Sequence, residues 1–127
     1  MEGNRVLIVG GGMVGAALAA DLGRRGLPAR VLEARPPAMP KADEPPRLRV
    51  SALNRRSLAY LTEIGAFGML HTQRLADFDE VMTWDIGGGG RLRFRADELG
   101  LDRLGLFIEN DHLQAALLEA ARLHESV

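Results

Sequence analysis

The sequence contains no cysteine and only three histidines, and both features exclude kinds of chemistry. Without cysteine the chain forms no disulfide, carries no thiolate nucleophile and binds no iron–sulfur cluster. His71, His112 and His124 have no partner at the spacing of zinc ligands, so no metal site is predicted. There is also no Gly-x-Ser-x-Gly nucleophile motif. We therefore expect a bound organic cofactor to supply any difficult chemistry.

The sequence also lacks a strong excess of either charge and any long apolar run. Its net charge is −1, so the composition gives no sign of a nucleic-acid partner. No apolar run approaches the roughly 20 residues that span a bilayer. The first apolar run begins at Val6, close to the first residue, so we expect no signal peptide before it. With 127 residues, of which 46% are hydrophobic, we expect a soluble cytoplasmic protein with one substantial core. Association with the inner membrane face stays open.

What the sequence does contain is a glycine cluster directly after a short apolar run. Gly10, Gly12 and Gly15 have the spacing Gly-x-Gly-x-x-Gly, and an alanine-rich helical run follows. In dinucleotide-binding βαβ units this spacing permits a tight turn, close approach of the backbone to a pyrophosphate, and close packing of helix on strand. The first turn of the helix, which includes Met13 and Val14, offers free N–H groups to phosphates. These five residues are predicted to bind a dinucleotide.

The residues after the helix strengthen this prediction. Gly26 is suited to end the helix, and residues 28–33 read as a second strand that finishes in an acid. Glu33 lies 23 positions after Gly10, close to the offset of about 20 expected for a carboxylate that binds a ribose. We predict that Glu33, followed by Ala34 and Arg35, lines the ribose side of the site.

The middle of the chain is less decisive. Residues 34–46 hold five of the six prolines and are predicted to form an extended loop, either a linker or a mobile excursion beside a cofactor. Ser51 is predicted to cap a helix that ends at Gly65. Arg47 and Arg49 precede that helix, and composition alone favours solvated surface charges.

The last third combines a predicted hairpin with a predicted strand and helix. Residues 78–95 are predicted to form two strands around four glycines, with alternating arginines on a solvent-exposed face of the second strand. No helix follows these glycines, so they do not predict a second phosphate loop. A strand is predicted over 106–109, and Asn110 or Asp111 is predicted to cap the final helix.

In this order, the residues resemble the opening of group A flavoprotein monooxygenases, and most of all the bacterial ubiquinone-biosynthesis hydroxylases. The resemblance covers essentially the whole chain. It rests on the run from Val9 to Gly15 with Ala19, Gly26 and Glu33, on residues 49–54, on residues 81–85 with their glycine-rich turn, and on residues 104–110 leading into Leu113 and Leu117.

The resemblance implies an α/β fold, with a Rossmann-like βαβ FAD-binding domain built on a three-layer parallel sheet. Residues 1–75 would belong to this domain, residues 76–98 would be the first hairpin of a substrate-domain sheet, and residues 99–127 would return to the FAD-binding domain. The glycine turn would face the FAD pyrophosphate and Glu33 the adenosine ribose. Arg49 would approach the pyrophosphate, which reverses the interpretation from composition, and Asn110 would lie near the ribityl chain.

The implied activity is hydroxylation of a small aromatic substrate, a prenylated phenol or quinol precursor of ubiquinone, with FAD reduced by NAD(P)H. No catalytic residue can be assigned, and a homo-oligomer or a biosynthetic complex stays open. Members of this family are much longer, and their later Gly-Asp motif has no counterpart here. The chain thus resembles an N-terminal fragment. We predict that it binds FAD weakly or not at all, hydroxylates nothing, and exposes on its last helix a surface meant for missing strands.

Two other functions fit parts of the pattern. A nicotinamide-dependent dehydrogenase or a flavin reductase would use Glu33 equally well, although the loop over 36–46 with Arg49 behind it argues against a simple NAD domain. The third alternative is a non-catalytic, nucleotide-binding remnant.

Overall fold

The computed structural model describes residues 4–127, so the first three residues of the predicted domain over 1–75 lie outside the described residues. The first elements are strand β1 (Val6–Val9), helix α1 (Met13–Arg24) and strand β2 (Ala29–Leu32). The two strands pair in parallel, with Val6 opposite Ala29 and Val9 opposite Leu32. The predicted parallel βαβ unit is therefore confirmed.

Helix α1 ends as its glycine predicts. Gly26 has a φ of 69°, a left-handed conformation that favours glycine. Its N–H donates to Gly23 O at 2.9 Å, and Leu27 N–H donates to Leu22 O at 2.9 Å. These two bonds form a Schellman motif, which turns the chain directly into β2.

The segment from Val50 to Asn54 is a strand, β3, and not the start of a helix. Helix α2 (Arg55–Glu63) follows it, and Asn54 Oδ1 caps this helix by accepting a hydrogen bond from Ser57 N at 2.9 Å. The prediction that Ser51 caps the helix is therefore wrong. The apolar residues around Ser51 fit a strand and a helix equally well over so short a segment. Pairing with a distant strand decides that this segment is a strand.

That distant strand is β7 (Gly105–Glu109), which forms the centre of an antiparallel sheet in the order β3–β7–β4. Short 3₁₀ turns over Phe67–Met69 and Thr72–Arg74 lead into β4 (Ala76–Phe78). The Phe78 ring packs on Phe107, with ring centroids 5.0 Å apart. The hairpin predicted for 78–95 therefore starts too early, because Phe78 belongs to this sheet.

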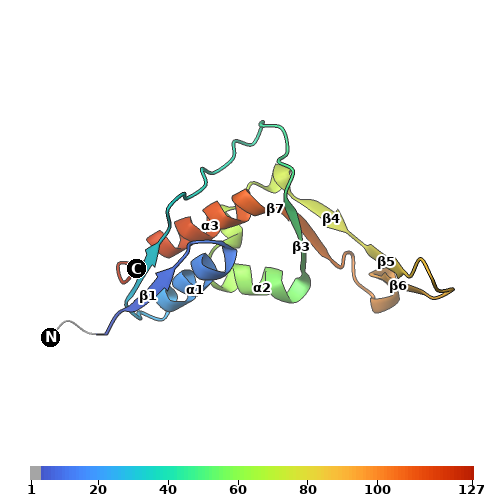
Figure 1. Ribbon diagram of the computed structural model, residues 1–127, viewed down its shortest axis with the longest axis horizontal. Coiled ribbons are helices and arrows are strands. Elements are labelled where there is room, and N and C mark those ends of the chain that lie inside the picture. The colour runs from blue at the N-terminus through green and yellow to red at the C-terminus, as the bar shows by residue number, and fades with distance from the viewer. Residues whose placement is uncertain (1–3) are drawn as a thin grey trace.

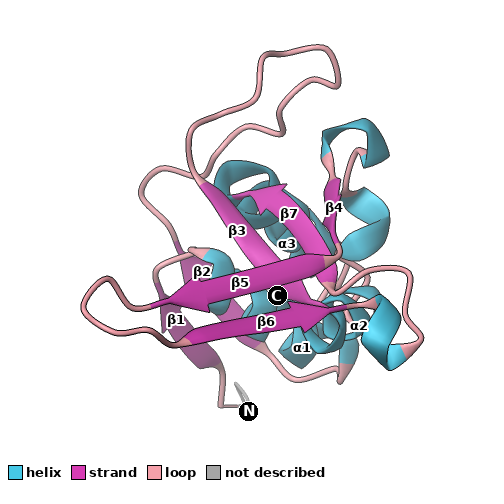
Figure 2. Ribbon diagram, turned by 90° about the vertical axis from the view of Figure 1, so that its right-hand side faces the viewer, coloured by secondary structure: helices cyan, strands magenta, loops and turns pink. Residues whose placement is uncertain are grey.

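The hairpin itself consists of β5 (Glu80–Trp84) and β6 (Arg91–Arg95). Figures 1 and 2 show that this hairpin projects at the end of the molecule opposite β1 and β2. In the sequence, a 3₁₀ turn over Asp97–Leu99 follows it. Val81 lies opposite Phe94, and Trp84 lies opposite Arg91. All four are exposed, so both faces of the hairpin meet solvent, and not only the arginine face.

Helix α3 (Asn110–Arg122) packs mainly against α1, also contacts β7 and the Phe67–Met69 turn, and forms the centre of the core. Its most deeply buried apolar residues, Ala116 and Leu117, join Ala19 and Ile108 in one cluster. The N-cap is Glu109, without a side-chain capping bond from any described residue, so the prediction that Asn110 or Asp111 caps this helix is wrong.

The expectation that α3 exposes an apolar surface is also wrong, because eight of its residues are buried. The exposed apolar surface lies elsewhere. Leu7, Val9 and Leu32 on the parallel pair are 58%, 81% and 49% exposed. Residues 4–127 thus cover one face of this pair, and of the three predicted layers they supply the sheet and one helical layer. In this part of the chain the structure contains no helix long and apolar enough to cross a membrane.

Candidate dinucleotide site

The glycine turn between β1 and α1 is tightly wound. Gly10 has a φ of 102°, and its N–H donates to Leu32 O at 2.8 Å, which ties the turn to the end of β2. A Cβ added at Gly15 would lie 2.1 Å from Gly10 O, so only glycine lets α1 start this close to the strand. A Cβ at Gly12 would meet nothing within 4 Å. Backbone atoms therefore fill the space beside Gly15, whereas no described residue fills the space beside Gly12.

The N-terminus of α1 is left free of side chains. Gly12 is its N-cap, no described side chain caps it, and its first turn holds no acidic residue. The first N–H groups of a helix have no partner within the helix, and its dipole adds partial positive charge there. The amides of Gly12, Met13 and Val14 thus present donors to open space. This arrangement fits the pyrophosphate of a dinucleotide.

Glu33 lies at the end of β2, directly beside this turn. Its Oε2 accepts a hydrogen bond from Gly11 N at 2.8 Å, and its Oε1 accepts one from Arg35 N at 2.8 Å. The bonds from Arg35 and Gly11 lower the pKa of Glu33 below its ordinary value, so the side chain is ionised at neutral pH. A carboxylate has about four lone-pair positions, which leaves room for two ribose hydroxyls.

Gly11, to which the sequence assigned no role, is held from both sides. Its N–H binds Glu33, and its carbonyl oxygen accepts a hydrogen bond from Gln114 Nε2 on α3 at 2.7 Å. The contact with Gln114 joins residues that are 103 positions apart. No motif in the sequence indicated it.

The structure places Arg49 and Asn110 together but gives them different surroundings. Asn110 N donates to Arg49 O at 2.9 Å, and Ser51 Oγ donates to Asn110 Oδ1 at 2.7 Å. Asn110 is one helical turn before Gln114, and therefore near the glycine turn. Arg49 is exposed, and its guanidinium makes no hydrogen bond to residues 10–15 in the described chain. Ala34 is likewise exposed.

A buried ion pair that the sequence did not reveal fixes the loop before Arg49. The side chains of Arg74 and Glu109 are 4% and 5% exposed, and Arg74 Nε and Nη2 donate to the Glu109 oxygens at 2.7 Å each. The remaining Arg74 protons bind backbone oxygens of the proline-rich loop, those of Lys41, Glu44 and Pro45. The guanidinium has five N–H donors, and all of them are used.

Glu109 Oε1 also accepts a hydrogen bond from Arg47 N at 2.5 Å. The Arg47 side chain donates from Nη1 to Asp111 Oδ2 at 2.8 Å. The bond from Arg74 lowers the pKa of Glu109, and burial opposes this effect only in part. The loop is therefore fastened at its end, immediately before β3. These contacts hold the end of the loop, and the choice between a linker and a mobile excursion stays a prediction.

His112 is buried beneath the same region. It is 0% exposed, and its Nε2 accepts a hydrogen bond from His71 N at 3.0 Å. The two imidazole rings stack with centroids 5.5 Å apart, and His112 Nδ1 has no partner among the described residues. Burial, together with His71, lowers the pKa of His112, so the ring is neutral at pH 7.

This lowered pKa predicts a dependence of stability on pH. Below about pH 6.5 the unfolded chain binds a proton at His112 that the folded chain does not bind, so folding becomes less favourable as pH falls. We expect the free energy of unfolding, measured with urea, to fall by up to about 1.4 kcal/mol per pH unit below pH 6.5. His112→Gln should remove this slope and His124→Gln should retain it. Equal slopes for both variants would contradict the assignment.

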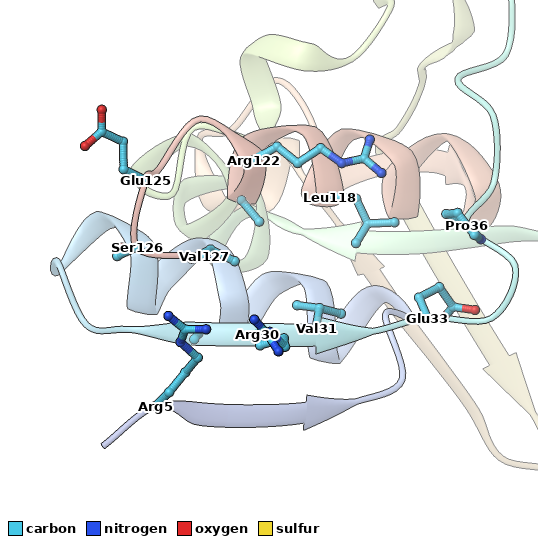
Figure 3. Close-up of a pocket in the computed structure, with 12 residues that line it drawn as sticks. Arg5, Arg30, Val31, Glu33, Pro36, Leu118, Arg122, Glu125, Ser126 and Val127 are labelled. Carbon is cyan, nitrogen blue, oxygen red and sulfur yellow. The ribbon is translucent and has the colours of Figure 1, made fainter. Parts of the chain in front are cut away.

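Two cavities lie near the turn. An open groove of about 530 Å³ between α1, α2, β3 and α3 is lined largely by apolar side chains, including Met13, Leu53 and Leu113. Figure 3 shows the other, of about 430 Å³, which lies between β2 and the C-terminal half of α3, with Arg5 and Glu33 at its two ends. None of residues 10–15 lines this second cavity, whereas Met13 and Val14 line the apolar groove. In residues 4–127 no group of side chains is suited to hold a metal ion.

The chain matches known proteins along most of its length. The family described as FAD binding domain matches residues 4–102. The chain is 37% identical over 122 residues to 3-demethoxyubiquinol 3-hydroxylase of Escherichia coli (strain K12), which covers 96% of this chain and 31% of that protein. It is 32% identical over 117 residues to human ubiquinone biosynthesis monooxygenase COQ6, which covers 88% of this chain and 25% of that protein.

Solved structures show the same fold. The crystal structure of p-nitrophenol 4-monooxygenase from Pseudomonas putida DLL-E4 matches with a TM-score of 0.66 at 22% identity, over 98% of this chain and 31% of that one. A tetrameric 2-methyl-3-hydroxypyridine-5-carboxylic acid oxygenase matches with a TM-score of 0.63 at 20% identity, over 97% and 30%. The chain spans less than a third of the length of each relative. The family matches residues 4–102, and the glycine turn and the Glu33 carboxylate fit the cofactor. The chain therefore belongs to the FAD binding domain family.

Proposed function

We propose that this chain is the FAD-binding portion of an NAD(P)H-dependent aromatic-ring hydroxylase that acts on a prenylated phenol or quinol precursor of ubiquinone. The observation that supports the cofactor site most directly is the uncapped N-terminus of α1 behind a glycine turn, with the Glu33 carboxylate beside it. The substrate class is supported by the names of two relatives, which are ubiquinone-biosynthesis enzymes.

Each group in the site has a distinct role in this proposal. The amides of Gly12, Met13 and Val14 bind the pyrophosphate, and Glu33 accepts hydrogen bonds from the adenosine ribose. Arg49 adds positive charge to the pyrophosphate side, and Asn110 binds the ribityl side. When FAD is bound and reduced, it supplies the chemistry of oxygen transfer to the ring. The chain's own residues hold the adenosine half of the cofactor, and Asn110 extends the contact to the ribityl chain.

We propose further that this half-site by itself binds FAD weakly and does not hydroxylate. The chain spans 31% of the length of two relatives to which it is similar, so it supplies only part of the surface that would enclose the cofactor. The purified chain should therefore carry less than one flavin per molecule, while FAD at millimolar concentration should shift the amide resonances of Gly12 to Gly15. Stoichiometric yellow flavin on the purified chain would contradict weak binding. NAD binding without FAD binding would favour a dehydrogenase.

Glu33→Gln tests the ribose contact. The substitution removes the negative charge but keeps the size of the side chain, and a hydrogen bond to a charged group contributes about 1.5–3 kcal/mol. We expect FAD to bind about tenfold more weakly or worse, measured by titration of the amide resonances. Glu98→Gln, an equally conservative change at an exposed residue of the Asp97–Leu99 turn, is the control. Equal FAD affinity for the two variants would argue against the role of Glu33.

A further inference from the structure

Gln114 lies on α3, outside the glycine motif, yet it contacts Gly11, which occupies a variable position of the motif. Its Nε2 donates to Gly11 O at 2.7 Å, and the side chain is partly buried. Gly11 is itself buried, and its N–H is bound by Glu33 at 2.8 Å. Both polar groups of Gly11 are therefore fixed, one by the end of β2 and the other by α3.

The consequence falls on the next amide in the chain. The carbonyl of Gly11 and the N–H of Gly12 belong to one peptide unit, which is planar. The described residues contain no cis peptide bond, so this unit is trans and its N–H points opposite to its C=O. A hydrogen bond that holds Gly11 O toward α3 thus turns Gly12 N–H away from α3.

The space on that side is where an anion would bind. A Cβ at Gly12 would meet nothing within 4 Å, and Gly12 N–H has no hydrogen-bond partner within residues 4–127. Without Gln114 the peptide has two glycine neighbours, and glycine permits rotation that other residues resist. The donor would then spend part of its time in orientations that do not face the ligand.

We propose that Gln114 is a positioning residue for the cofactor site: it holds the peptide between Gly11 and Gly12 so that Gly12 N–H faces the pyrophosphate. The inference rests on the proposed FAD-binding function, but it makes a separate statement about the free chain. It also explains why a polar side chain is placed on the face of α3 that packs against α1 and the turn.

Gln114→Met tests the proposal, because methionine has a similar length and no donor. The chain's other glutamine, Gln73, lies exposed on the Thr72–Arg74 turn, and Gln73→Met is the matched control. In the free chain, we expect Gln114→Met to shift the Gly11 carbonyl carbon and Gly12 amide resonances, and Gln73→Met to leave them unchanged. FAD should bind Gln114→Met about five- to tenfold more weakly, the loss expected for one hydrogen bond.

Gln114→Glu separates positioning from packing. The ionised carboxylate cannot donate to Gly11 O, whereas the protonated acid can. We expect the loss of FAD affinity relative to the unsubstituted chain to shrink as pH falls through the pKa of the new carboxyl group. A role in packing alone would give a loss that does not change with pH, and would overturn the proposal.

The readouts distinguish the failure of this inference from failure of the proposed function. Unchanged Gly11 and Gly12 resonances in free Gln114→Met would overturn the positioning role, whatever the chain binds. Shifted resonances in the variant, combined with no response of the unsubstituted chain to FAD, would overturn the FAD site but retain the effect of Gln114 on the peptide.

Discussion

Replacing Arg74 with methionine is expected to lower the free energy of unfolding by about 3–5 kcal/mol, the cost of leaving a buried charge without its partner. Methionine fills much of the same space, so the loss measures the lost hydrogen bonds and the isolated Glu109 carboxylate. That carboxylate is 5% exposed, and without Arg74 the one donor it keeps among residues 4–127 is Arg47 N. Urea unfolding of the variant provides the measurement.

Two further variants make the Arg74 prediction specific. Arg103→Met breaks an exposed ion pair with Asp77, in which the side chains are 40% and 63% exposed, so it should cost less than about 1 kcal/mol. Combining Arg74→Met with Glu109→Gln removes the isolated charge and should recover part of the loss. A cost for Arg74→Met no larger than that for Arg103→Met would refute the importance of the buried pair.

The same substitution should release the proline-rich loop. Arg74 binds the carbonyl of Lys41, which is the only lysine in the sequence, so a lysine-specific protease has a single site. Lys41 is exposed, and cleavage there is limited by how readily the surrounding loop leaves its place. Faster cleavage in Arg74→Met than in Arg103→Met would link the ion pair to the loop directly.

Gly15→Ala is expected to destabilise the fold strongly, whereas Gly12→Ala should affect binding much more than stability. The added Cβ at Gly15 would lie 2.1 Å from Gly10 O and 3.2 Å from Ile8 Cγ2, so the turn or α1 must move. Overpacking of this kind costs about 1–3 kcal/mol or more, and we expect the upper end, because one of the two atoms belongs to the backbone.

Gly12→Ala provides the matched comparison for the same chemical change. Gly12 has a φ of −64°, which alanine adopts readily, and its Cβ would meet nothing within 4 Å. Alanine is a poorer N-cap than glycine, which allows a loss of stability of up to about 1 kcal/mol. The methyl group would, however, occupy the space in front of the turn, so FAD binding should be lost. Equal urea midpoints for Gly15→Ala and Gly12→Ala would contradict the claim that α1 packs too closely on Gly10 O to admit a side chain at Gly15.

The buried ion pair also shows where sequence reasoning stops. Arg74 and Glu109 are 35 residues apart, on a 3₁₀ turn and at the end of a strand, and nothing in their spacing marks them as partners. Arginine and glutamate are usually exposed, so the sequence favours surface positions for both. Only the antiparallel sheet β3–β7–β4 brings the end of β7 beside the proline-rich loop.

The two wrong helix-cap predictions have the same origin. The local sequence predicts a helix cap at Ser51 and at Asn110, because short polar residues before apolar runs are commonly caps. In the structure they bind each other at 2.7 Å across the junction of β3 and α3. Pairing of two segments far apart in sequence overrides the local preference of each, and a local pattern contains no information about a remote partner.

The sequence by itself determined the parallel βαβ unit, the glycine turn, the end of α1 at Gly26 and the acid at the end of β2. These features are local, since each depends on the conformations that a few neighbouring residues permit. The tertiary structure alone decided that Glu33 and Gln114 hold Gly11 from two sides, that Arg74 fastens the loop before Arg49, and that α3 is buried. These contacts depend on how distant elements pack, which no single stretch of sequence specifies.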